Sequence, residues 1–128
     1  MMDAEALEYE YATVRVVPSM ERGEFVNVGL LMSGIDVEYL AFRPRRNLTR
    51  FHGLWPGVDW AMVEQHLSRI GAICQGPWPD SDQQLRWRNR FQWLVAPKSA
   101  LIQCSEVHGA WTYLTLEAEM DRLSLRYL

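Results

Sequence analysis

The N-terminal third of the chain alternates between apolar and more polar residues with the period of a β-strand. In residues 9–17, Ala12, Val14 and Val16 share one face, and the residues between them share the other. The pattern predicts two further strands, at residues 24–32 and 37–42. Because the linkers between the three segments are short, we expect an antiparallel meander.

The second predicted strand has two unlike faces. One face is wholly apolar and consists of Val26, Val28, Leu30 and Met32. The opposite face carries Asn27 and Gly29, which strict alternation places side by side. A glycine on that face leaves room for a backbone or a ligand to approach.

Two later segments have helical periodicity. A stripe of apolar residues, spaced by three and four, predicts a helix over residues 59–75 with Asp59 as its N-cap: Trp60, Val63, Leu67, Ile70 and Cys74. A final helix is predicted over 116–127, with Thr115 as the cap, acidic residues in its first turn and arginines in its last. A short helix is expected between Leu48 and Leu54.

The remaining apolar runs are short. Residues 91–95 and 101–104 are interpreted as two more strands, which places Trp93 in the core. Strands and helices that occur in separate groups are typical of the α+β class. We therefore expect a single domain, residues 1–128, in which the 59–75 helix and the C-terminal helix cover one face of an antiparallel sheet.

Composition narrows the class of protein. The chain has 128 residues, of which 48% are hydrophobic, and a net charge of −3, values close to those of ordinary globular domains. Its two cysteines are too few for a disulfide framework. The acidic N-terminus does not resemble a signal peptide, and no apolar run is long enough to span a bilayer. A cytoplasmic protein without membrane contact is expected.

The charges are unevenly distributed along the chain. Residues 1–42 hold eight acidic and two basic side chains, whereas residues 43–90 hold eight arginines and four acidic side chains. One arginine cluster comprises Arg43, Arg45, Arg46 and Arg50, and the other comprises Arg86, Arg88 and Arg90. In an extended segment the second cluster would line one side, opposite aromatic rings. Three hypotheses for the role of these arginines remain open: nucleic-acid binding, docking of an acidic protein, and pairing with the acidic strands of the same chain.

Catalytic and metal-binding motifs are sparse. His52, His66 and His108 do not stand at metal-ligand spacings, and no phosphate-binding glycine motif occurs. Cys74 lies on the apolar stripe, where burial is expected to raise its pKa. Cys104 and His108 project to one side of a regular strand but lie too far apart for a hydrogen bond. A small enzyme centred on His108 is the weakest of the alternatives, and no cofactor or metal is predicted.

Two stretches of the sequence carry motifs that can be compared with those of known families. Tyr11–Pro18 followed by Glu21–Gly29, and Arg90–Leu94 followed by Ala96–Ser99 and Ile102–His108, resemble the bacterial domain-of-unknown-function family 3037. The resemblance covers the chain from about Tyr9 to its end. It departs from the family near His108, where the family usually has proline for Glu106 and threonine-glycine after the histidine.

The resemblance implies no established activity. Members of the family look like small stand-alone bacterial proteins that are often encoded beside a HipA-like kinase, which implies such a kinase as a partner. In the first motif Gly23 permits a positive φ, Arg22 and Glu24 are placed to pair across the linker, and Asn27 is placed to hydrogen-bond its backbone.

These observations favour a non-enzymatic protein-interaction module, possessing neither catalytic residues nor a metal site. The predicted partner-binding residues are Arg15, Arg22, Glu24, Asn27, Gly29, Arg86, Arg88, Arg90 and His108. The alternative is a nucleic-acid-binding protein that uses Arg43, Arg45, Arg46 and Arg50. The sequence leaves the oligomeric state open.

Overall fold

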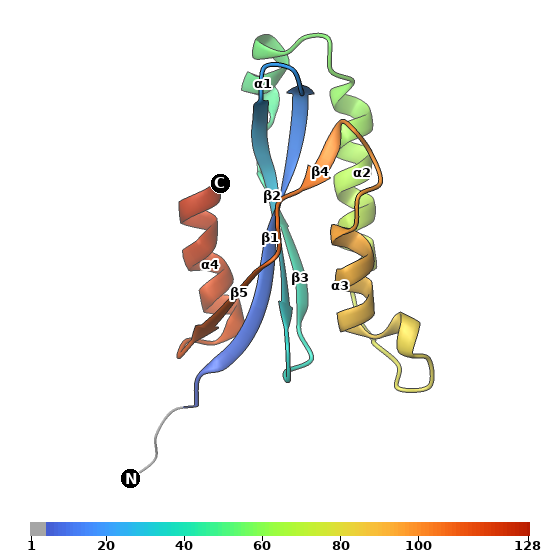
Figure 1. Cartoon of the computed structure of the whole chain (residues 1–128), viewed down its shortest axis with the longest axis vertical. Coiled ribbons are helices and arrows are strands. Elements are labelled where there is room, and N and C mark those ends of the chain that lie inside the picture. Colours follow the sequence, from blue (N-terminus) through green and yellow to red (C-terminus); the bar gives the residue numbers. More distant parts are fainter. Residues whose placement is uncertain (1–4) are drawn as a thin grey trace.

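A computed structural model describes residues 5–128, so Asp3 of the acidic N-terminal region lies outside the described residues. Three strands form the predicted antiparallel meander: β1 (Leu7–Ser19), β2 (Glu24–Gly34) and β3 (Leu40–Pro44). The β1–β2 hairpin is long, and its tip extends past the end of the C-terminal helix (Figure 1). The meander and the α+β class are as the sequence predicts.

Two short strands complete the sheet by pairing with different halves of β1. β4 (Ile102–Cys104) pairs antiparallel with Val14–Val16, and β5 (His108–Thr112) pairs antiparallel with Leu7–Tyr11. The order across the sheet is therefore β3-β2-β1-β4, with β5 beside the first half of β1. The long strand β1 is the centre of the sheet.

In the described part of the chain, four α-helices and one short 3₁₀ helix connect or flank the strands. They are α1 (Thr49–Leu54), α2 (Trp60–Ile73), η1 (Gln83–Leu85), α3 (Trp87–Val95) and α4 (Leu116–Tyr127). The predicted N-caps are confirmed, because Asp59 accepts from the Met62 amide at 3.1 Å and Thr115 from the Ala118 amide at 3.1 Å. Within residues 5–128, no helix combines the length and apolar character needed to cross a membrane.

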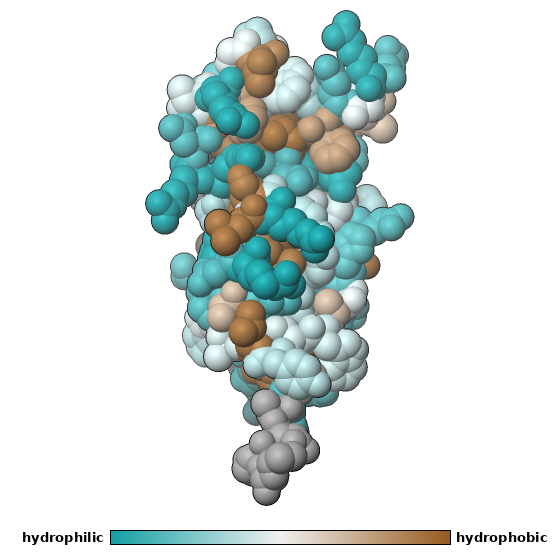
Figure 2. Space-filling view, turned by 90° about the vertical axis from the view of Figure 1, so that its left-hand side faces the viewer, coloured by the Kyte–Doolittle hydropathy of each residue, from teal (hydrophilic) through white to brown (hydrophobic). Residues whose placement is uncertain are grey.

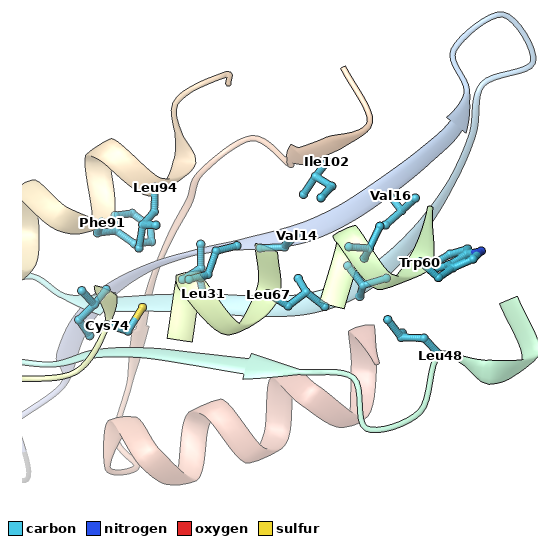
Figure 3. Packing of buried hydrophobic residues seen from close by; sticks show 14 of the residues in the cluster. Val14, Val16, Leu31, Leu48, Trp60, Leu67, Cys74, Phe91, Leu94 and Ile102 are labelled. Atoms are coloured by element: carbon cyan, nitrogen blue, oxygen red, sulfur yellow. The ribbon is translucent and has the colours of Figure 1, made fainter. Parts of the chain in front are cut away.

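The helices cover both faces of the sheet. α2 and α3 pack on one face around a large cluster that includes Val14, Leu67 and Phe91 (Figure 3). α4 packs on the other face through a smaller cluster with Tyr9 and Met32, and Figure 1 shows it on the opposite side of the sheet from α2 and α3. The expectation that α2 and α4 share one face is therefore wrong.

A β-bulge in β2 explains this difference. Val14 pairs with Gly29, but the next residue of β1, Arg15, pairs with Asn27, which leaves Val28 as an extra residue. One extra residue exchanges the two faces of a strand. Val26 and Val28 thus join the large cluster, whereas Leu30 and Met32 join the cluster beneath α4. The face that strict alternation predicts as continuous is divided between the two layers.

The segment predicted as a strand at residues 91–95 belongs to helix α3. Its buried residues, Trp87, Phe91 and Leu94, follow the spacing of one helical face. Trp93 points away from that face and is 57% exposed, so its expected place in the core is wrong. The alternation of arginine with other residues in this segment conceals the helical spacing.

Candidate functional site

The uncovered part of the sheet lies beside the end of α4. Asn27 on β2 donates from Nδ2 to the carbonyl oxygen of Tyr127, the last residue of α4, at 3.3 Å. Arg15 pairs with Asn27 across the strands, and Phe25 follows towards the hairpin tip on the same face. We call this surface, together with Arg22 and Glu24 at the turn, the hairpin face.

The polar groups of the hairpin face are incompletely satisfied. The Arg15 guanidinium lies over the Phe25 ring at 4.3 Å and makes no hydrogen bond or ion pair with residues 5–128. Its Nε and the Oδ1 atom of Asn27 are buried without a hydrogen-bond partner among the described residues. An unsatisfied buried polar group costs about 1–3 kcal/mol. The Nη atoms of Arg15 are not among these buried atoms, so a carboxylate of another molecule can reach the guanidinium there.

The hairpin turn carries both apolar and charged side chains that are exposed. Gly23 has φ 65°, as the sequence predicts, and its amide donates to the Met20 carbonyl at 3.1 Å. Met20 is 68% exposed and Phe25 50% exposed. The expected Arg22–Glu24 ion pair is not among the contacts of the described residues, so Arg22 stays exposed and available.

Gly29 has a structural role rather than an open space beside it. A Cβ atom at this position would lie 2.4 Å from Cε1 of the Phe42 ring. Because of the bulge at Val28, Gly29 faces the α2 side of the sheet, whereas Asn27 faces α4. The prediction that these two residues share a face is wrong. The Phe42 ring occupies the space beside Gly29 that the sequence predicts to be open to a backbone or a ligand.

The second arginine cluster does not form an extended row, because Arg88 and Arg90 lie on α3 and Arg86 is the N-cap of that helix. Arg88 pairs with Glu10 and donates to Ser33 Oγ at 2.9 Å. Arg86 pairs with Glu38 at 3.1 Å and with Asp80. Arg90 donates to two backbone carbonyl oxygens at the end of α2, at 2.9 and 3.1 Å. These contacts agree with the reading in which the arginines pair within the chain.

The first arginine cluster is held within the chain only in part. Arg43 pairs with Glu117 at 3.3 Å and with Asp121, and Arg45 donates to the Leu128 carbonyl oxygen at 2.7 Å. Arg50 lies over the Phe51 ring at 5.0 Å, and Arg46 is exposed. Half of this cluster therefore serves to hold β3 against α4.

His108 and Cys104 do not form a catalytic pair. His108, on β5, is exposed, and its ring lies tilted beside the Tyr11 ring, with 5.3 Å between the ring centroids, on the α4 face. Cys104 packs against the large cluster on the opposite face, where burial raises the pKa of its thiol. Burial likewise raises the pKa of Cys74 to about 12, as the helical stripe predicts. Within residues 5–128, no cluster of metal-ligating side chains occurs.

The comparison with protein families identifies the chain. A model described as a protein of unknown function, DUF3037, matches residues 11–128. The chain belongs to the DUF3037 family. No curated protein and no solved structure matches it.

The stretches that carry the DUF3037 resemblance lie in two places. Residues 11–29 form most of the β1–β2 hairpin, including the hairpin face. Residues 90–104 form the end of α3, the loop after it and β4, which line a pocket together with α2. Sequence reasoning missed this pocket. The only lysine of the chain, Lys98, lies in that loop, and it was the one feature of the sequence that could have indicated the pocket.

Proposed function

We propose that this DUF3037 protein is a non-enzymatic interaction module and that its partner binds the hairpin face. The observation that carries the proposal is the arrangement at Arg15, Phe25 and Asn27. Among residues 5–128, a guanidinium without a carboxylate partner lies over a half-exposed aromatic ring, next to a buried amide oxygen without a donor. Arginine and aromatic residues are enriched among the side chains that dominate protein interfaces.

The chemistry of the hairpin face indicates which groups a partner must present. An acidic side chain pairs with the accessible Nη atoms of Arg15, and an apolar side chain covers Phe25 and Met20. Figure 2, which shows the α4 side, has its apolar residues in separate patches among hydrophilic ones. Affinity is thus concentrated in a few anchors rather than spread over a broad apolar area. A HipA-like kinase is the partner that we propose to test first.

The experiment is co-purification of the tagged chain with a HipA-like kinase from the same organism. Phe25→Ala and Arg15→Met each weaken binding by at least tenfold, because each removes an anchor. The controls are Leu125→Ala, which truncates a side chain 90% exposed on α4, and Arg46→Met. All four variants keep the melting temperature of the parent. A kinase that does not bind, or that binds all variants equally, contradicts the proposal.

The nucleic-acid alternative is tested separately. Binding through the first cluster would use Arg46 and Arg50, because Arg43 and Arg45 are held by contacts within the chain. It would appear as a gel shift that weakens steeply with salt. We expect no shift at low salt. A shift that Arg46→Ala and Arg50→Ala abolish would replace the protein-interaction proposal.

A further inference from the structure

A pocket of about 370 Å³ opens between α2, the end of α3 and β4. Its inner wall is apolar and consists of Val14, Ile70, Ile73, Leu94 and Ile102. Val14, Leu94 and Ile102 also belong to the large cluster (Figure 3), so the wall is held by the core. The volume lies within the range of small-molecule sites, although at its lower end. The pocket is on the opposite face of the sheet from the hairpin face.

The polar groups around this pocket are all basic or neutral. Arg69 and His66 come from α2, Lys98 comes from the loop after α3, and no acidic residue of the described part of the chain lines the pocket. Burial and the neighbouring cations lower the pKa of His66, so it is neutral at pH 7. Two positive charges, on Arg69 and Lys98, therefore face the pocket at that pH. Neither makes an ion pair with a carboxylate of residues 5–128.

The side chain of Lys98 is positioned by contacts that do not neutralise its positive charge. Its Nζ lies 4.2 Å from the centre of the Trp93 ring and donates to the Ala96 carbonyl oxygen at 3.1 Å. Lys98 is exposed at the rim of the pocket, so an anion from outside the chain can reach its ammonium group.

Cys104, which lines the pocket together with the uncharged side chains of Ser99 and Gln103, does not compete for these cations. Burial raises the pKa of its thiol, so it stays neutral at pH 7. The thiol donates weakly to the Leu94 carbonyl oxygen at 3.6 Å. The positive charges of Arg69 and Lys98 are thus available to bind a ligand from outside the chain.

We propose that this pocket binds a small organic carboxylate with an apolar body. The apolar body fills the space against Ile70, Leu94 and Ile102, and the carboxylate lies at the rim between Lys98 and Arg69. A single carboxylate matches this site better than a phosphate, because Arg69 and Lys98 are the two charged donors among the described residues that line it. The apolar wall and the charged rim are both needed for affinity.

The test is calorimetric titration of the full chain with octanoate. We expect saturable binding with one site, and binding of octanol at least tenfold weaker. Lys98→Met and Arg69→Gln each weaken octanoate binding at least fivefold, whereas Arg46→Gln, the matched control far from the pocket, leaves it unchanged. Both substitutions are on the protein surface or in a loop, and unchanged melting temperatures verify the fold.

Three outcomes would overturn the inference. They are the absence of saturable octanoate binding, equal affinity for octanol, and octanoate affinity that neither Lys98→Met nor Arg69→Gln changes. The result is independent of the proposed partner-binding function, because Phe25→Ala does not touch the pocket and is expected to bind octanoate as the parent does.

Discussion

At the scale of single residues, the most consequential polar group in the core is Glu119 of α4. Its side chain is only 2% exposed. It accepts from Arg122 Nε at 2.7 Å and Nη2 at 2.9 Å, and also from the Tyr9 hydroxyl. A buried carboxylate is tolerated only when it is paired and hydrogen-bonded in this way. The network fixes α4 to the first strand of the sheet.

The network makes stability depend on pH. The hydrogen bonds from Arg122 and Tyr9 hold the pKa of Glu119 below its ordinary value, against the opposing effect of burial. Its contribution is therefore complete above about pH 5, near the upper end of titration of an unfolded glutamate, and is lost as the pH falls through the folded pKa. Glu119→Gln should lower the free energy of unfolding by about 1–3 kcal/mol at pH 7 and flatten its dependence on pH below 5.

Urea unfolding between pH 3 and 7 measures this effect. Glu64→Gln, at an exposed position of α2, is the matched control and should keep the dependence of the parent. If Glu119→Gln shows the same acid sensitivity as the parent, the account of this network is wrong.

At the scale of elements, sequence reasoning succeeds where one local pattern decides the structure. The alternation in β1 and the stripe of α2 are read directly from apolar spacing, and both elements are confirmed. The bulge at Val28 is not predictable in this way, because it depends on the register with β1. α3 is missed because its arginines mimic a period of two, and β5 because three of its five residues are exposed.

The close approach of β2 and β3 gives a test of the bulged sheet. Gly29→Ala places a methyl group against the Phe42 ring, and such overpacking costs about 1–3 kcal/mol. Gly53→Ala is the control: apart from its chain neighbours and the backbone of its own helix, no atom of residues 5–128 lies within 4 Å of the added Cβ, and the position is inside α1. It should be neutral or stabilise by up to about 1 kcal/mol. Thermal unfolding in which both variants behave alike would contradict the register.

At the scale of the whole molecule, the sheet separates two candidate binding surfaces. The hairpin face lies on the α4 side, and the Lys98 pocket lies between α2, α3 and β4. The location of the first was predictable, because Arg15 and Asn27 stand on adjacent strands of a hairpin. Which arginines are available was not predictable, because pairs such as Arg88–Glu10 join residues 78 positions apart.

Backbone NMR of the labelled chain, titrated with the unlabelled kinase partner, tests the central claim most directly. We predict that shifts and line broadening concentrate at Arg15 and along residues 20–27, and that Phe25→Ala suppresses them. Changes centred on α3 or on the Lys98 pocket, with residues 20–27 unaffected, would contradict the assignment of the hairpin face as the binding surface.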